Sequence, residues 1–261
     1  MSSLPAKALL WLTHMLFSIV TQLINTVRWL KRHALKRYTR NHLSHKQESD
    51  VIQRTVQSLE KVPRHLAVIL GPECPDYSQL VRFIPWCLSA KIEFVSFYDQ
   101  KGLLKANFHR MMEHVQQQLR DQNDQIVWTP QLKSTGALLP PRNGYRRRIV
   151  VNFFSHEDGR KQLVTAARSI STELRNGTLS KPSEITVELV DQTMQNLVHQ
   201  VPDPELAVYF GTVCCTYGML PWQIRLTEFV SLQAPSLAEL GVEHFINSLY
   251  KYAKCEQRFG K

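Results

Sequence analysis

Apolar runs alternate with amphipathic stretches along most of the chain. Residues 65–70 (HLAVIL) form a continuous apolar run that stops at Gly71-Pro72, as a strand buried on both faces does. Residues 49–62 instead place their apolar side chains on one helical face, and Pro63 ends that stretch. The same criteria predict strands at residues 65–70, 92–98, 126–128, 149–154, 206–210 and 224–232.

Helices are expected between these strands. Apolar residues recur at helical spacing over residues 77–88, 103–119, 160–174 and 237–252, and Pro182 begins a further helix that ends near residue 199. Strands and helices that alternate in this way predict an α/β fold, in which a mostly parallel central sheet of about six strands is flanked by helices. Residues 133–148 are interrupted by Gly and Pro and end in Arg146, Arg147 and Arg148, so we expect a basic loop there.

The formal charge of +10 is concentrated at the N-terminus. Residues 1–46 hold eight of the 32 Lys and Arg residues and none of the 22 Asp and Glu residues, so the rest of the chain carries 24 basic and 22 acidic side chains. A domain this close to neutral lacks the broad positive surface that binding to a nucleic-acid backbone usually requires. Nucleic acid is therefore not expected as a partner, although a basic RNA-binding or nuclear-import arm is the alternative interpretation of the N-terminal segment.

Residues 8–27 contain no charged side chain and, as a helix, would span about 30 Å, the thickness of a bilayer core. Five polar residues from His14 to Asn25 recur at helical spacing and make one stripe. A spanning helix would turn this stripe toward another helix, whereas an interfacial helix would turn it toward water. A cleaved signal peptide is disfavoured because no small-x-small cleavage site follows.

Six Lys or Arg residues lie between Arg28 and Arg40, and the positive-inside rule then keeps the following domain in the cytosol. The same residues would be attracted to anionic membrane lipid. We therefore expect a membrane anchor at residues 1–30, a basic juxtamembrane linker at 31–48 and one globular domain at 49–261.

The cysteines give no sign of a metal site. Cys74, Cys87, Cys214, Cys215 and Cys255 show neither CxxC pairs nor zinc-ligand spacing, and they are typical of reduced thiols in the cytosol. The adjacent Cys214 and Cys215 are interpreted as ordinary buried small residues. No GxGxxG or Walker-type loop follows a predicted strand, which argues against a nucleotide cofactor.

The segment of residues 202–228 (PDPELAVYFGTVCCTYGMLPWQIRLTE) resembles the signature region of the cis-prenyltransferases, the undecaprenyl and dehydrodolichyl diphosphate synthases. Active members carry PDLxIRTxGExRxSNFxxWQ and, a few residues later, a glutamate. The spacing matches without a gap from Pro204 to Glu228. Residues 65–70 are similar to the start of the family's HxAxIMDGN, residues 157–164 (EDGRKQLV) to its GGRxEI, and the ending Arg258-Phe259-Gly260 to its RxG.

The chain departs from this pattern at the residues that carry the chemistry. Gly71 stands where the family has the aspartate that binds magnesium and the allylic diphosphate, and Tyr209 and Cys215 stand where it has two diphosphate-binding arginines. Val213 and Tyr217 replace the glutamate and the serine of the motif. Each charge-assisted bond to an arginine contributes about 1.5–3 kcal/mol, so these changes remove several kcal/mol of diphosphate binding. The resemblance thus implies a chain that is inactive alone and a Mg²⁺ ion held by a catalytic partner.

Three segments are similar to one branch, the Nogo-B-receptor-type accessory subunits of dehydrodolichyl diphosphate synthase: YDQKGLLKAN (98–107), GMLPWQIRLTEFVSL (218–232) and the ending YAKCEQRFGK. This implies a non-catalytic but required subunit, paired with a homologous catalytic cis-prenyltransferase. The complex would elongate farnesyl diphosphate with isopentenyl diphosphate for dolichol synthesis and protein glycosylation, at the cytosolic side of the endoplasmic reticulum membrane. The alternatives are a membrane-anchored scaffold or receptor with no role in substrate binding, and an autonomous enzyme with a rearranged site.

The resemblance also implies the site residues. Arg258 and Gly260 would bind the phosphates of isopentenyl diphosphate in the partner's active site, with Phe259 between them. Arginine supplies a planar fork for phosphate, and glycine lets the backbone N–H groups approach closely. Glu228 falls on the family glutamate that is associated with the metal and tail region, and a structural ion pair is its alternative role.

Trp222 and Phe229 are expected at the subunit interface, and no metal ligand is expected in this chain. His65 falls on a family position but is interpreted as structural. Lys105 and Asn107 match the branch without a phosphate chemistry that explains them.

Overall fold

The chain divides into two compact units, residues 1–44 and 45–261. The computed structural model describes residues 10–23, 26–27, 44–71, 75–118, 124–131, 147–197, 201–234 and 237–256. In the first unit, residues 10–23 form a helix whose apolar side chains, including Trp11 and Phe17, are exposed. Within the described ranges, no helix combines the length and the apolarity needed to cross a bilayer. The spanning helix predicted at residues 8–27 is therefore not supported.

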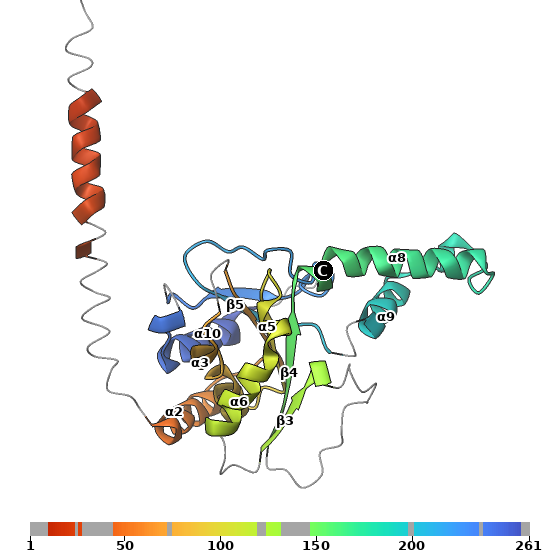
Figure 1. Cartoon of the computed structure of the whole chain (residues 1–261), viewed down its shortest axis with the longest axis horizontal. Coiled ribbons are helices and arrows are strands. Elements are labelled where there is room, and N and C mark those ends of the chain that lie inside the picture. Colours follow the sequence, from red (N-terminus) through yellow and green to blue (C-terminus); the bar gives the residue numbers. More distant parts are fainter. Residues whose placement is uncertain are drawn as a thin grey trace, which may run out of the picture. The chain divides into compact units, whose positions relative to one another are not determined.

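The second unit is built on one parallel sheet, as the apolar runs predicted. Its six strands follow the order β3–β4–β2–β1–β5–β6, and every pairing is parallel (Figure 1). The strands are β1 (His65–Ile69), β2 (Phe94–Tyr98), β3 (Asp124–Trp128), β4 (Arg147–Phe154), β5 (Leu206–Tyr209) and β6 (Glu228–Ser231). Each residue of β1 and β2 is buried, which explains why both strands read as continuous apolar runs.

Helices connect and flank the strands (Figure 1). They are α2 (His45–Gln57), α3 (Tyr77–Leu80), α4 (Phe83–Ser89), α5 (Leu103–Ala106), α6 (Phe108–Gln118), α8 (Arg160–Arg175), α9 (Val187–Leu197) and α10 (Val242–Lys254), with short 3-10 turns η1 (His156–Asp158), η2 (Pro182–Glu184) and η3 (Leu237–Glu239). In Figure 1, α8 extends away from the sheet, and α9 lies beside α8.

Two helices that the apolar spacing predicts as continuous are each divided. The helix predicted at residues 77–88 is split into α3 and α4, because Pro85 has no N–H to donate to the carbonyl four residues earlier. The helix predicted at residues 103–119 is split into α5 and α6. There Asn107 leaves the helical conformation, with φ −119° and ψ 27°, and both its backbone N–H and its side chain donate to the carbonyl of Leu103.

Two further boundaries differ from the predictions. Residues 221–226 form a turn instead of the start of β6, since the backbone N–H groups of Gln223 and Ile224 both donate to the carbonyl of Leu220. Arg147 and Arg148 belong to β4 and not to a loop. The Arg147 guanidinium makes a two-point contact with the carboxylate of Asp124 on β3, at 2.7 and 2.9 Å.

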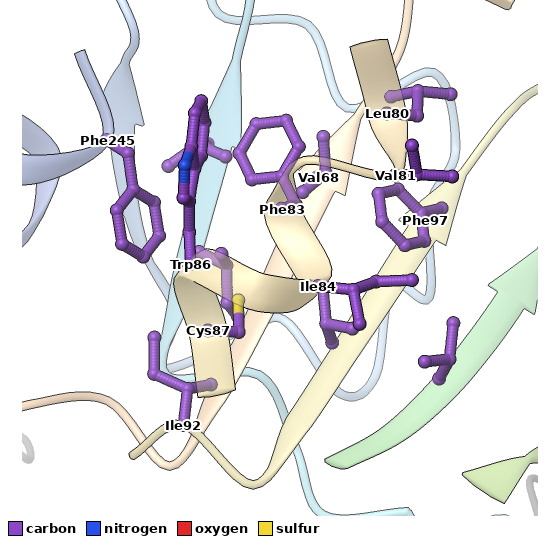
Figure 2. Packing of buried hydrophobic residues seen from close by; sticks show 14 of the residues in the cluster. Val68, Leu80, Val81, Phe83, Ile84, Trp86, Cys87, Ile92, Phe97 and Phe245 are labelled. Atoms are coloured by element: carbon purple, nitrogen blue, oxygen red, sulfur yellow. The ribbon is translucent and has the colours of Figure 1, made fainter. Parts of the chain in front are cut away.

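Most of the core lies on one face of the sheet, under α2, α4, α6 and α10. Figure 2 shows its aromatic centre, in which the rings of Trp86 and Phe245 lie 5.5 Å apart and Phe83 packs edge-on against both. Burying side chains of this size stabilises the fold by about 1.5–3 kcal/mol each. The Trp86 indole donates to the buried carboxylate of Glu48, which connects α2 to this cluster.

The opposite face of the sheet is covered by a smaller hydrophobic cluster. Ala67, Ile69, Tyr98 and Phe154 point to this side and pack against Met219 and Leu220, which belong to the segment between β5 and β6. A loop, and not a helix, therefore covers the sheet here. This segment contains the residues that resemble the signature region.

Candidate functional site

The carboxyl edge of the sheet is where parallel α/β folds usually bind ligands. Gly71 lies just after β1, Asp99 after β2, Ser155 after β4, and Tyr209 ends β5. Residues 211–220, which follow β5, lie over this edge, because the Tyr98 hydroxyl donates to the carbonyl of Tyr217 at 2.6 Å. The edge is thus bounded by the residues that would form a diphosphate pocket.

Tyr217 lies in the part of this edge where the family has its aspartate. A side chain built on Gly71 would have its Cβ 3.8 Å from the Tyr217 hydroxyl. Tyr217 itself has a positive φ of 50°, and Gly218 follows with a φ of 80°, so the loop makes a tight left-handed turn at this point. Gly71, at the position of the family's aspartate, and Tyr217, at the position of the motif's serine, therefore lie next to each other at this edge.

A close backbone contact holds this loop against α8. A Cβ on Gly159 would lie only 2.3 Å from the carbonyl oxygen of Gly218, so no other residue fits at position 159 without a shift of the backbone. This explains in packing terms why EDGR contains glycine at its third position. The glycine belongs to the fold of the edge and not to a phosphate cradle.

The acidic groups near the edge are already engaged within the chain. The Asp99 carboxylate accepts from the backbone N–H groups of Lys101 and Leu104, both at 2.9 Å. Asp158 accepts from the Lys105 ammonium at 2.9 Å and from the backbone of Ser155 at 2.8 Å. Within the described part of the chain no three Asp, Glu, His or Cys residues are grouped as metal ligands. Mg²⁺ prefers carboxylate oxygens that remain free, so Asp99 and Asp158, as the structure describes them, do not fit it.

The two positions at which the family has arginines hold uncharged residues here, and these two residues differ in their exposure to solvent. Tyr209 is half-buried and packs against the apolar cluster of the loop-covered face. Cys215 is exposed together with Cys214, so the interpretation of this pair as buried small residues is wrong. Val213, at the position of the motif's glutamate, is 77% exposed. These three positions at the edge therefore carry no arginine or glutamate side chain.

A small hollow of about 10 Å³, room for about one water molecule, lies beside His65. Its walls come from His65, Phe154, Val201, Pro202, Pro204, Leu220 and Gln223. Pockets that bind drug-sized ligands usually enclose about 300–1,000 Å³, so this hollow is too small for a prenyl diphosphate.

His65 has a structural role, as the sequence suggested. Its Nδ1 lies 2.6 Å from the carbonyl of Pro202, so Nδ1 carries the proton and Nε2 accepts from the Ser96 hydroxyl at 2.6 Å. Ser96 in turn accepts from the Asn152 side chain at 3.2 Å. Burial lowers the pKa of His65 to about 4, which keeps the imidazole neutral. This chain of bonds joins β1, β2 and β4 in the sheet interior.

Glu228 lies at the opposite, amino edge, because it is the first residue of β6. Its carboxylate contacts the Cys255 thiol, and burial together with this negative charge raises the pKa of that thiol. The Tyr252 hydroxyl nearby lies 3.4 Å from Glu205 Oε2, and burial and Glu205 raise the pKa of Tyr252 to about 12. Glu228 is thus beside the end of α10, remote along its strand from the chain's own carboxyl edge.

Trp222 and Phe229 differ in their contacts, although both are half-buried. The Trp222 indole donates to the Asp191 carboxylate on α9, and the Arg225 guanidinium stacks 3.7 Å above the indole while pairing with Asp191 at 3.0 Å. Phe229 packs against the loop-covered face of the sheet. Arg258, Phe259 and Gly260 lie outside the described residues, as do Cys74 and Arg146.

The comparisons with known proteins agree with this architecture. No family model matches the chain. The mouse dehydrodolichyl diphosphate synthase complex subunit Nus1 is 34% identical over 208 residues, which are 79% of this chain and 68% of the relative. The chain belongs to the Nus1 family.

Other members of the Nus1 family show the same relationship. The human subunit is 32% identical over 209 residues, 78% of this chain and 69% of its own length. The Schizosaccharomyces pombe subunit is 24% identical over 258 residues, and the match covers 96% of both chains. All three relatives are named as subunits of the dehydrodolichyl diphosphate synthase complex.

Solved structures establish the cis-prenyltransferase fold for this Nus1-family chain. Lavandulyl diphosphate synthase from Lavandula x intermedia has a TM-score of 0.55 at 17% identity and covers 77% of this chain and 99% of its own. A probable undecaprenyl diphosphate synthase from Campylobacter jejuni has a TM-score of 0.51 at 15% identity and covers 78% of this chain and 100% of its own. At these identities the likeness concerns the fold alone.

The sequence did not reveal several residues that shape the site. The Tyr217–Gly71 and Gly159–Gly218 contacts join segments far apart in the chain, and only the glycine in EDGR hinted at the second. Lys105 and Asn107 now have structural explanations, an ion pair with Asp158 and a helix break.

Proposed function

We propose that this chain is the accessory, non-catalytic subunit of a heteromeric dehydrodolichyl diphosphate synthase, which elongates farnesyl diphosphate with isopentenyl diphosphate. The observation that carries the proposal is a cis-prenyltransferase fold whose carboxyl edge has Gly71, Tyr209 and Cys215 at the positions of the metal and diphosphate ligands. A homologous subunit would then hold the Mg²⁺ ion and perform the condensation. The names of the mouse and human relatives, which are subunits of such a complex, support this assignment.

The contribution of this chain to the chemistry would be its C-terminal tail. Arg258 would bind the diphosphate of isopentenyl diphosphate through its planar guanidinium, and the backbone at Phe259 and Gly260 would approach the same group closely. These interactions position the incoming substrate in the partner's active site. Glu228, beside the start of the tail, would support its base and is not proposed as a ligand of the chain's own pocket.

The reach of the tail supports action in another chain. The tail starts at the amino edge, where Cys255 contacts both Lys61 and Glu228. From Cys255 to Gly260 an extended backbone covers about 17–18 Å. Gly71 lies at the other end of β1, about 20 Å along the strand from its first residue. A tail that starts at the amino edge would have to be almost fully extended to reach the pocket of its own chain, which supports its action in a partner.

The partner would bind near the same edge. Trp222 and Phe229 are half-buried beside the amino end of β6, and the neighbouring Leu226 is 60% exposed. Half-buried aromatic residues next to an exposed apolar side chain are typical of the core of a protein–protein interface. We assign this surface to the catalytic subunit.

The first unit would attach the complex to the cytosolic face of the endoplasmic reticulum membrane. The helix of residues 10–23 exposes Trp11, Leu16 and Phe17 by 66–71%, and basic residues follow it in the sequence. Such a pairing of apolar and basic side chains favours a bilayer that contains anionic lipid.

A vesicle assay tests this attachment. The full chain with Trp11→Glu, or with Phe17→Glu, should bind phosphatidylserine-containing vesicles at least tenfold more weakly in co-sedimentation. Val51→Glu on α2 is the matched control, because it adds the same charge at an exposed apolar position of the second unit. Equal binding of all three proteins would contradict membrane attachment through this helix.

The catalytic proposal is tested in the reconstituted heterocomplex. Arg258→Ala and Gly260→Ala should each lower isopentenyl transfer at least tenfold while the two subunits still co-purify, and the chain without its partner should form no product. An unchanged rate in both variants would support a scaffold without a role in substrate binding. Product from the chain alone would support an autonomous enzyme.

A further inference from the structure

The end of α10 is held by a lysine from a distant part of the sequence. Lys61 lies between α2 and β1, and its ammonium donates a hydrogen bond to the backbone carbonyl of Cys255. The same ammonium lies 4.9 Å from the centre of the Tyr252 ring, in a cation–π contact. Cys255 is the residue at which α10 ends, and its backbone is extended, with φ −75° and ψ 124°.

The physical effect of this contact is clear from the properties of helix ends. The last carbonyl groups of a helix have no partner within the helix and carry a partial negative charge. A cation that bonds to one of them stabilises the final turn, and the ring contact with Tyr252 restricts where that cation lies. Lys61 therefore fixes the point and the direction in which the backbone leaves α10.

Further contacts join the end of α10 to the segments around Lys61. Glu205 Oε2 accepts from the backbone N–H of Arg64 at 2.5 Å and lies 3.4 Å from the Tyr252 hydroxyl. The Glu228 carboxylate contacts Cys255 from β6. The segment before β1, the starts of β5 and β6, and the end of α10 thus meet in one cluster at the amino edge.

We propose that Lys61 is a positioning residue for the C-terminal tail: by holding Cys255, it directs Arg258 and Gly260 toward the isopentenyl diphosphate site of the partner. This inference rests on the proposed function, since Lys61 acts only through the tail. When the last turn of α10 frays, the tail samples more directions, and a smaller fraction of the complex has Arg258 in place. The apparent affinity for isopentenyl diphosphate falls by that fraction.

The experiment uses the heterocomplex with an unaltered catalytic partner, at saturating farnesyl diphosphate. Lys61→Met should raise the KM for isopentenyl diphosphate at least threefold while kcat changes less than twofold. Lys61→Arg, which keeps the charge and a donor, should restore most of the affinity. Lys254→Met is the matched control, because Lys254 is exposed in the same final turn, and its KM should equal that of the unaltered complex.

A double-mutant cycle separates positioning from general stability. Lys61→Met combined with Arg258→Ala should be no worse than Arg258→Ala alone, because Lys61 has no effect once the tail arginine is gone. Effects that multiply, or an unchanged KM in Lys61→Met, would overturn the positioning role even where Arg258→Ala is damaging. A silent Arg258→Ala would instead overturn the proposed function itself. Should Lys61→Met reduce assembly, Lys61→Gln, which removes the charge and the cation–π contact with Tyr252, should raise the KM in its place, and an unchanged KM would overturn the role of the charge.

Discussion

The two edges of the sheet are held together by different interactions. At the carboxyl edge, backbone groups pack closely in the Gly159–Gly218 pair, and the Tyr217 hydroxyl lies beside Gly71 with room for an ordinary contact. At the amino edge, ionisable groups meet: Lys61, Glu205 and Glu228 surround the end of α10. The comparison teaches that close backbone packing can hold a loop at one edge of the sheet, while charged residues organise the segments that meet at the other edge.

The largest expected effect concerns His65, at the amino end of β1. Its folded pKa of about 4 lies below the ordinary histidine pKa of 6.5, so the unfolded chain binds the extra proton between these pH values. The stabilisation from neutral His65 is complete above pH 6.5 and is lost as the pH falls toward 4, by about 3 kcal/mol in total.

Denaturant titrations of the full chain between pH 4 and 7 measure this slope. Asp203 contributes with the opposite sign, because burial and Asp191 raise its pKa to about 6. The difference between the unaltered chain and His65→Gln isolates the imidazole. His109→Gln is the control, since His109 is exposed, and it should keep the full slope. An equal pH slope of the unfolding free energy in His65→Gln would contradict the claim that the buried, neutral imidazole of His65 causes this slope.

Gly159→Ala tests the close packing of the carboxyl edge. The new Cβ meets the Gly218 carbonyl at 2.3 Å, so the loop or α8 has to move, and the free energy of unfolding should fall by about 2 kcal/mol. Gly71→Ala is matched, because its Cβ has ordinary contact at 3.8 Å and should change stability by less than about 0.5 kcal/mol. Equal melting temperatures for both variants would contradict the packing explanation.

The smallest expected effect concerns the surface beside the amino edge. Leu226→Glu should weaken binding of the catalytic subunit about tenfold, or about 1.4 kcal/mol, without changing the melting temperature of the chain. Val51→Glu on α2 places the same charge away from the signature segment and should bind normally. Isothermal titration with the purified partner measures both. Undiminished affinity in Leu226→Glu would remove this surface from the interface.

The sequence predicted the sheet well because buried parallel strands are apolar throughout, a local property that needs no tertiary information. Gly71, Tyr209 and Cys215 could be read directly against the family motif, and the loss of metal and diphosphate binding that they imply stays a prediction. Helix boundaries were less accurate, since one proline and one asparagine side chain redirected the backbone at Pro85 and Asn107.

The contacts that shape the site could not be predicted from local patterns. Lys61 and Cys255 are 194 residues apart in the sequence, and neither belongs to a motif that indicates the other. The exposure of Cys214 and Cys215 depends on a loop whose path is set by Tyr98 and Gly159. Such pairings arise only when the sheet brings distant segments to one edge.

The central claim is that the tail acts in the active site of another chain. The most direct test places a photoreactive p-benzoylphenylalanine at position 259 in the heterocomplex and maps its crosslinks by mass spectrometry. We predict crosslinks to the catalytic subunit that isopentenyl diphosphate suppresses. Crosslinks to this chain's own residues around Gly71 would contradict the claim.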